Sequence, residues 1–206
     1  EELAEEGDQA TWGEVFGKSL RKPLMVGVGL AVFQQITGIN AIIYYANEIF
    51  AKAGFTTPEQ QAKATLYAIG VVNVLATFIA VGFVDRVGRR PLLLAGLVGM
   101  TLSLAGVGFA FLAFDETGTQ TGPSTVGIIT VVCLIVFIAS FAFSLGPVVW
   151  TVINEIYPNR VRGRAVSVAT AVNWGAAFLV SQFFLTLVDG IGTAATFWLF
   201  SGFSVI

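Results

Sequence analysis

Amide side chains interrupt an otherwise apolar stretch of the sequence, between residues 23 and 50. Gln34 and Gln35 are adjacent, Gly38 weakens the predicted helix, and Asn40 follows two residues later. An amide both donates and accepts hydrogen bonds, as the hydroxyl groups of a neutral polyol do. A single amide in a membrane span usually joins helices, but several around a glycine at mid-span favour a cavity for a polar ligand.

Later stretches carry further polar and aromatic candidates for the same cavity. They are Asn73 with Thr77 one turn away, Trp150 one turn beyond Pro147, and the adjacent pair Asn173 and Trp174. Pro147 lacks an amide proton and is predicted to kink its helix. An indole face covers the apolar side of a sugar ring. The alternative for an indole is the aromatic belt at the membrane surface, which is our interpretation of Trp12 and Trp198.

Residue types that support other chemistry are scarce. The sequence has no histidine and one cysteine, Cys133, so it contains no metal-ligand spacing. A carboxylate or phosphate ligand would call for Arg or Lys, and no basic residue lies deep in an apolar stretch. Glu48, Asp85 and Glu155 lie at the ends of such stretches, which leaves no carboxylate at mid-membrane depth for a coupling proton. A membrane enzyme is therefore the weakest interpretation.

The composition indicates which solvent surrounds these residues. Hydrophobic residues make up 55% of the sequence and charged residues 12%, and the mean hydropathy is +0.80. Soluble domains usually carry about a quarter charged residues. A helix needs roughly 20 apolar residues to cross a bilayer. Five stretches reach this length: residues 23–50, 62–84, 91–114, 126–156 and 165–188.

A sixth apolar stretch begins near Thr193 and extends only to Ile206, which is too short to cross a bilayer. Unpaired backbone groups are unfavourable in lipid, so each span is predicted to be a helix. The predicted fold class is all-α, a polytopic membrane protein.

The basic residues predict the orientation of these helices. Nine of them fall on one side of the membrane if the five spans alternate: Lys18, Arg21, Lys22, Arg86, Arg89, Arg90, Arg160, Arg162 and Arg164. Only Lys52 and Lys63 fall on the other side. By the positive-inside rule, the Arg-rich connections are predicted to be cytoplasmic.

Acidic residues lie beside arginines at the predicted cytoplasmic ends of the helices. Asp85 begins the turn DRVGRRP, in which Gly88 permits a bend, and Glu155 lies seven residues before Arg162. Two interpretations remain open on these residues alone. The carboxylates either pair with arginines of both turns and hold the helix ends together, or they are solvated and contribute about 0–1 kcal/mol.

Residues 1–22 are predicted to be a cytoplasmic linker segment. Their acidic start is unlike a secretory signal peptide. Thr11 and Glu14 have the spacing of a capping box, which predicts either a short helix or, equally, a solvated linker.

Five motifs occur together in this sequence. They are FQQITGINAIIYY at 33–45, DRVGRRPL at 85–92, GPVVW at 146–150, NEIYPNRVRGRA at 154–165 and NW at 173–174. In this order and spacing the sequence resembles the sugar porter family of the major facilitator superfamily, specifically its C-terminal six-helix half. The resemblance implies that residues 23–206 are a transmembrane half-domain with an incomplete last helix.

The resemblance also implies roles for particular residues. Sugar-binding residues would be Gln34, Gln35, Asn40, Asn73, Trp150, Asn173 and Trp174. Tyr44 and Tyr45 would help to close the outer gate. A cytoplasmic charge network that favours the outward-facing state would comprise Asp85, Arg86, Arg89, Arg90, Glu155 and Arg162.

The function implied by the resemblance is transport of a monosaccharide, a hexose or pentose, across the plasma (inner) membrane by alternating access. The partners would be the lipid bilayer and the N-terminal half of the same transporter, and no nucleic acid. No cofactor is expected except a coupling proton, which would act through the N-terminal half. The alternative function is a non-transporting sugar sensor of the same fold. Alone, this half is expected not to transport.

Overall fold

The computed structural model describes residues 11–114 and 125–205, and at positions 81, 83–87 and 114 it describes the backbone only. All regular structure in these residues is helical. Asp85 and Arg86 therefore lie outside the described side chains, and nothing follows for them beyond their place near the end of a helix.

The first span is built from separate helical pieces. After the short helix α1 (Trp12–Val15) come α2 (Arg21–Ile36), α3 (Ile39–Tyr44) and α4 (Ala46–Lys52). Gly38 separates α2 from α3 with φ of +88°, in the left-handed region that favours glycine. The predicted break at Gly38 is confirmed. A second break, at Tyr45, had no signal in the sequence.

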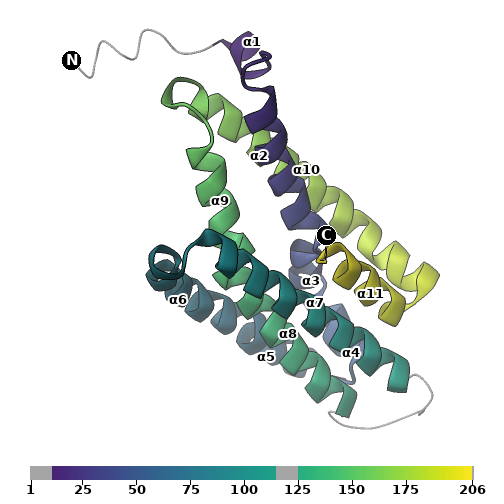
Figure 1. The fold of residues 1–206 in the computed structure, drawn as a ribbon. Coiled ribbons are helices and arrows are strands. Elements are labelled where there is room, and N and C mark those ends of the chain that lie inside the picture. The colour runs from purple at the N-terminus through teal and green to yellow at the C-terminus, as the bar shows by residue number, and fades with distance from the viewer. Residues whose placement is uncertain (1–10, 115–124, 206) are drawn as a thin grey trace.

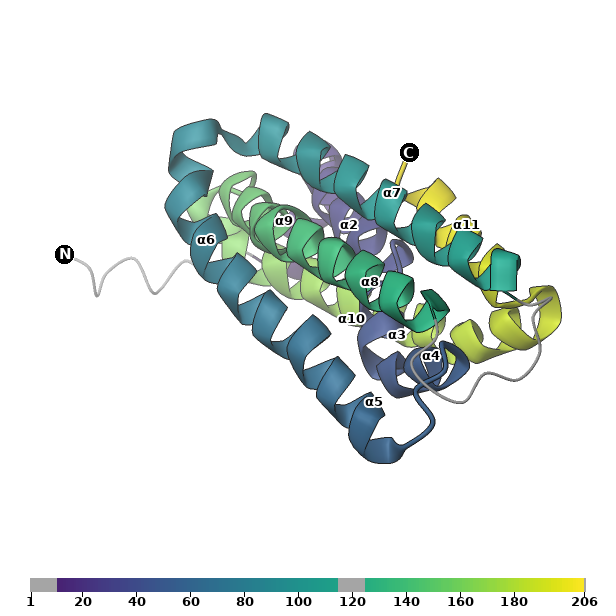
Figure 2. The same cartoon turned by 90° about the horizontal axis from the view of Figure 1, so that it is seen from below.

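The second span is one rod that contains a change of helix type. It consists of α5 (Pro58–Thr65), the π-helical segment η2 (Leu66–Val71) and α6 (Val72–Val87), and Figure 2 shows the pieces in line. The Thr57 hydroxyl caps the start of α5 by accepting a hydrogen bond from the Gln60 amide at 3.2 Å. The π-helical segment was not predicted.

The remaining helices follow in order: α7 (Arg89–Phe114), α8 (Thr125–Phe143), α9 (Leu145–Glu155), α10 (Asn159–Ile191) and α11 (Thr193–Phe203). The predicted kink at Pro147 is displaced, because the helix breaks at Ser144 and Pro147 lies in the first turn of α9. Proline is tolerated there, since the first amide groups of a helix have no partner within it. The helix α10 also begins earlier than predicted, so Arg160, Arg162 and Arg164 are helical.

Five helical segments are long and apolar enough to cross a membrane. They are Arg21–Tyr44, Pro58–Ala80, Arg89–Ala113, Thr125–Glu155 and Asn159–Ile191. They correspond one to one with the five predicted spans, so the all-α, polytopic prediction is confirmed.

The packing of the helices is shown in Figures 1 and 2. The helix α2 lies against α10, whereas α7 lies between α8 and α11, and α6 packs on α8. Small residues permit the close contact of α7 with α8, because a methyl group added at Gly99 would collide with the Ser140 side chain. The resulting bundle brings the amide-rich part of α2 and α3 beside α10.

Candidate functional site

The centre of the candidate site is a network of amide side chains between α2 and α10. The Asn173 Nδ2 group donates to the Ala31 carbonyl at 3.0 Å and to Gln34 Oε1 at 2.9 Å. The Gln34 Nε2 group donates to the Leu145 carbonyl at the start of α9, at 3.0 Å. Three helices that lie far apart in the sequence are therefore joined through two amide side chains.

The network continues toward α3 through the second glutamine. Gln35 Nε2 donates to Asn173 Oδ1 at 3.1 Å, and Asn40 Nδ2 donates to Gln35 Oε1 at 2.8 Å. The break at Gly38 lies between these two residues, and Asn40, five residues after Gln35, contacts it across the break. The glycine packs against the Phe200 ring of α11, 3.1 Å from the position where a Cβ would lie.

Burial distinguishes the members of this network. Gln34, Gln35 and Asn173 are 3%, 4% and 3% exposed, whereas Asn40 is only partly buried. Buried polar groups are stable when each is hydrogen-bonded, and in each of these three residues both the amide nitrogen and the amide oxygen form a hydrogen bond. The arrangement is a neutral, satisfied set of groups that meets the surface at Asn40.

The structure does not bring the other predicted sugar-binding residues into this network. Asn73 lies on α6, where its carbonyl accepts a hydrogen bond from the Thr77 hydroxyl at 2.8 Å. It lines a separate cavity of about 520 Å³ with Thr77 and Phe78. Trp150 is partly buried and packs against the hydrophobic core. Trp174 is adjacent to Asn173 but 58% exposed.

The two tyrosines predicted to form a gate differ in their surroundings. Tyr44 is exposed. The Tyr45 ring stacks on Phe184 of α10, with ring centroids 5.1 Å apart and an interplanar angle of 15°. Phe184 in turn contacts Phe197 and Phe200 of α11. Tyr45 therefore connects the break between α3 and α4 to an aromatic cluster.

Of the predicted charge network, the structure gives one ion pair between described side chains. Arg89, in the turn between α6 and α7, pairs with Glu155 at the end of α9. Arg162 donates from Nε to the Tyr157 carbonyl at 3.4 Å rather than to an acid. Arg90 is exposed. The pair joins the start of α7 to the end of α9, which agrees with the first of the two open interpretations for Glu155, and the choice between them stays open.

The N-terminal helix α1 packs on the start of α10. Arg160 pairs with Glu14 at 3.2 Å, and the Arg164 guanidinium lies 5.5 Å from the centroid of the Trp12 ring. The Trp12 ring therefore faces a cation of the same chain, and the aromatic-belt interpretation of this residue stays a prediction. The helix at α1 is present, but the Thr11 side chain does not cap its backbone. Opposite charges at Glu14 and Arg160 were the only signal of this contact in the sequence.

The aromatic ring of Trp198 also has a specific contact. Its Nε1 donates to the Ala105 carbonyl of α7 at 3.4 Å, and its ring meets Phe109 edge-on at 5.1 Å. The side chain is 37% exposed and belongs to the contact between α7 and α11. This contact was not predicted from the sequence.

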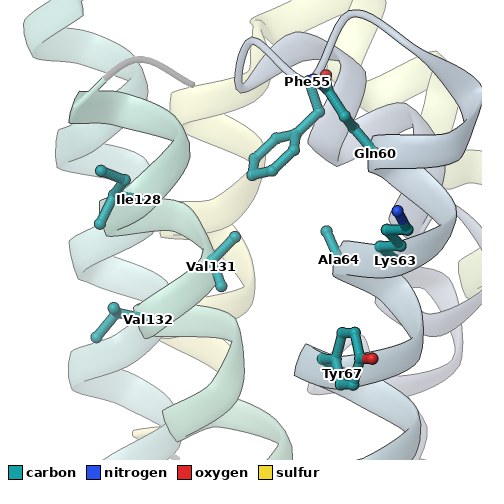
Figure 3. Close-up of a pocket in the computed structure, with 8 residues that line it drawn as sticks. All are labelled: Phe55, Gln60, Lys63, Ala64, Tyr67, Ile128, Val131 and Val132. Atoms are coloured by element: carbon teal, nitrogen blue, oxygen red, sulfur yellow. The ribbon is translucent and has the colours of Figure 1, made fainter. Parts of the chain in front are cut away.

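A cavity of about 410 Å³ between α5 and α8 shares no residue with the amide network. Figure 3 shows the Phe55 ring pointing between the two helices, with Val131 opposite Ala64. Its cationic group, Lys63, is paired with Glu59 at 2.6 Å. The lining is mainly apolar and offers few groups to a polyol, so the amide network is the better candidate.

These observations define the class of protein. Five helices of membrane length and a network of neutral amides between three of them, those that contain α2, α9 and α10, are typical of an integral membrane protein with a polar site between its helices. The sequence profile of the family described as "Sugar (and other) transporter" matches residues 1–206. The chain belongs to this family, which consists of transporters and not of enzymes.

Several characterised relatives are similar over most of this chain. The arabinose-proton symporter of Escherichia coli strain K12 is 40% identical over 91% of this chain and 39% of its own length. The D-xylose transporter of Levilactobacillus brevis is 39% identical over 95% of this chain and 40% of its own length. The facilitated trehalose transporter Tret1 of Aedes aegypti is 38% identical over 96% of this chain and 24% of its own length.

Solved structures agree with this assignment. The proton:xylose symporter XylE bound to 6-bromo-6-deoxy-D-glucose gives a TM-score of 0.74 at 33% identity, over 88% of this chain and 37% of XylE. A D-xylose-proton symporter gives 0.76 at 31% identity, over 99% of this chain and 44% of that protein. The chain thus spans 24% to 44% of the length of these relatives.

Proposed function

We propose that this chain supplies the C-terminal half of a monosaccharide transporter and most of its sugar-binding site. The observation that carries the proposal is the amide network of Gln34, Gln35, Asn40 and Asn173, held between α2, α3 and α10 by the break at Gly38. Neutral amides match the hydroxyls of a hexose or pentose. Relatives named for xylose and arabinose support the same class of substrate.

The other candidate residues complete the proposed site from neighbouring helices. Trp150 of α9 and Trp174 of α10 would cover the apolar faces of the sugar ring. Asn73 would add a polar group from α6. The cavity that Asn73 lines contains no residue of the amide network. Tyr44, the last residue of α3, and Tyr45, which follows it, are proposed to close the outer side.

The charged contacts are proposed to act on the cytoplasmic side of the plasma membrane. The Arg89–Glu155 pair would hold the inner ends of α7 and α9 together in the outward-facing state and open in the inward-facing one. Both side chains are about half exposed, so the pair contributes only about 0–1 kcal/mol. A weak pair of this kind permits interconversion of the two states.

Alternating access needs a second half that moves against this one around a site at mid-membrane depth. The exposed apolar side chains of α6 and α10, such as Leu75, Phe78 and Phe178, are available to lipid and to that half. A coupling proton, if the complete protein uses one, would be carried by the N-terminal half, since the present sequence has no acidic residue at mid-span.

Equilibrium binding of labelled sugars to the complete protein in detergent, at two pH values, tests this proposal. Saturable binding of D-xylose or D-glucose is expected, and Gln35→Ala is expected to weaken it about tenfold, the equivalent of one net hydrogen bond. Gln182→Ala, an exposed amide on α10, is the matched control and should bind normally. Unchanged affinity in Gln35→Ala would remove Gln35 from the site.

Flux into vesicles then separates transport from sensing. A transporter accumulates or equilibrates labelled sugar across the bilayer at a rate that saturates with sugar concentration. Binding without flux in vesicles of the complete protein would favour the sensor function. Flux by vesicles that contain only this chain would overturn the requirement for a second half.

A further inference from the structure

A buried hydroxyl group lies where α2 meets the turn between α9 and α10. Tyr157 is 1% exposed, and its hydroxyl forms no hydrogen bond with any residue that the structure describes. The side chain belongs to the hydrophobic core, together with Ile153 and Val161. A buried polar group without a partner costs free energy, so phenylalanine would be the more favourable residue in this packing. The hydroxyl of Tyr157 therefore destabilises the arrangement in which it is buried.

The hydroxyl faces a buried glycine of α2. A Cβ atom added at Gly27 would overlap the Tyr157 hydroxyl, and it would lie 3.0 Å from the ring Cζ atom and 3.4 Å from the Ile156 side chain. Only glycine at position 27 therefore leaves room for the hydroxyl. Phenylalanine at position 157 would remove the overlap and leave the 3.0 Å contact, which needs only small shifts of the neighbouring atoms.

Tyr157 lies at the end of α9 that carries the Arg89–Glu155 pair. Glu155 is the last residue of α9, and Tyr157 follows two residues later. The break at Ser144 separates α9 from α8, so α9 is able to change its tilt without α8. A movement of this end away from α2 would separate Tyr157 from Gly27 and expose the hydroxyl to water. The exposed hydroxyl would gain the hydrogen bonds that the buried one lacks.

We propose that the Tyr157 hydroxyl and Gly27 determine how far the inward-facing state of the transporter is populated. The hydroxyl fits only because position 27 is glycine, and it has no partner as long as the end of α9 is closed on α2. The closed arrangement is therefore less stable than it would be with phenylalanine, which keeps the inward-facing state accessible. This inference rests on the proposed function, in which the end with the Arg89–Glu155 pair opens in the inward-facing state.

Tyr157→Phe removes the buried hydroxyl and keeps the ring. Relief of one unsatisfied buried group changes the ratio of two states about fivefold or more. The inward-facing population should fall by this factor, measured from the distances between spin labels on the two halves of the complete protein without sugar. The midpoint of thermal unfolding should be equal to that of wild type or higher. Tyr67→Phe, at a tyrosine that is 63% exposed, is the matched control and should change neither quantity.

Gly27→Ala should act in the opposite direction. Its added Cβ overlaps the Tyr157 hydroxyl in the closed arrangement, so the inward-facing population should rise about fivefold or more. Gly29→Ala, on the same helix with nothing within 4 Å of the added Cβ, is the control and should leave the populations unchanged. When Gly27→Ala is combined with Tyr157→Phe, the overlap is absent, and the effect of Gly27→Ala should become at least twofold smaller.

Three results would contradict the proposed role of the hydroxyl. An inward-facing population that does not fall in Tyr157→Phe would overturn it. An unfolding midpoint of Tyr157→Phe below that of wild type would do the same, because the hydroxyl would then be stabilising. Equal effects of Gly27→Ala with tyrosine and with phenylalanine at position 157 would show that the two residues are not coupled.

The double variant also decides the case in which Gly27→Ala fails to fold. Recovery of folding when Tyr157→Phe is added would support the contact, and no recovery would overturn it. The wild type separates this inference from the function on which it rests. A single distance distribution for the complete wild-type protein, the same with and without D-xylose, would overturn the proposed alternating access. Two populations in wild type that the variants leave unchanged would overturn only the role of Tyr157 and Gly27.

Discussion

The amide network between α2 and α10 and the charged contacts at the helix ends stabilise the bundle by opposite means. The network is neutral, and its three central side chains are 3–4% exposed. The charged side chains of the Arg89–Glu155 and Arg160–Glu14 pairs are 40–54% exposed. The network is buried and satisfied within the chain, whereas the ion pairs are open to water and to salt.

This difference determines what each region is able to do. A buried group that loses its partner costs about 1–3 kcal/mol, so the network holds one geometry. An exposed ion pair is worth about 0–1 kcal/mol, so it forms and breaks easily. A rigid polar site and weak contacts at the helix ends would suit the alternating access proposed above, in which helices move around a fixed site.

The largest effect is expected from Gln34→Ala. This change leaves one N–H of Asn173 without a partner in the buried centre of the network and removes the hydrogen bond that the Leu145 carbonyl accepts from Gln34. Because an unsatisfied buried group costs about 1–3 kcal/mol, the midpoint of thermal unfolding in detergent should fall clearly, and sugar affinity should fall at least tenfold. Gln182→Ala should leave the unfolding midpoint of the protein unchanged. Equal midpoints for the two variants would show that the network does not stabilise the bundle.

A smaller but distinct loss is expected from Gly38→Ala. The residue has φ of +88°, and an added Cβ would lie 3.1 Å from the Phe200 ring. A left-handed non-glycine residue costs about 1–2 kcal/mol. The strain should displace Asn40 from Gln35 and weaken sugar binding several-fold. Gly29→Ala on α2, where an added Cβ meets nothing within 4 Å, provides the control in the same binding assay.

The smallest effect on stability, under about 1 kcal/mol, is expected from Glu155→Gln. It removes the charge that pairs with Arg89, and its effect on the unfolding midpoint should vanish in 1 M salt, where the screening length is about 3 Å. The distribution of distances between spin labels on the two halves of the complete protein should nevertheless change, with a larger population of the inward-facing state. Glu59→Gln, which breaks the Lys63–Glu59 pair, should leave that distance unchanged. A shift in both variants, or in neither, would remove the proposed role of Glu155.

Local features of the fold were predictable because they depend on nearby residues. Apolar length defines the spans, and Gly38 inside an amide-rich helix defines the break. The grouping of Gln34, Gln35 and Asn40 was also predictable, because these residues are close together in the sequence. The break at Ser144 was not predictable. The missing amide proton of Pro147 predicts a kink near this residue, but it does not determine at which turn the helix ends.

The candidate site was predictable only in part. Asn173 was a correct member of the amide network, but the sequence pattern did not reveal that its donors are all used within the chain. Asn73 and Trp174 had equally suitable chemistry, yet one lies in a separate cavity and the other is exposed. Residue type alone does not say whether a polar side chain joins the network, lies in another cavity or is exposed.

The sequence by itself determined that the helices are apolar enough to lie in a membrane, how many spans there are, where the first helix breaks and that the site is neutral. These follow from the length of apolar runs, the freedom of one glycine and the absence of buried charge. Tertiary structure decided which amides meet. Gln35 and Asn173 lie 138 positions apart and are joined by packing of α2 on α10. Each residue turns a helix by about 100°, so only the packed bundle fixes the face that a side chain occupies.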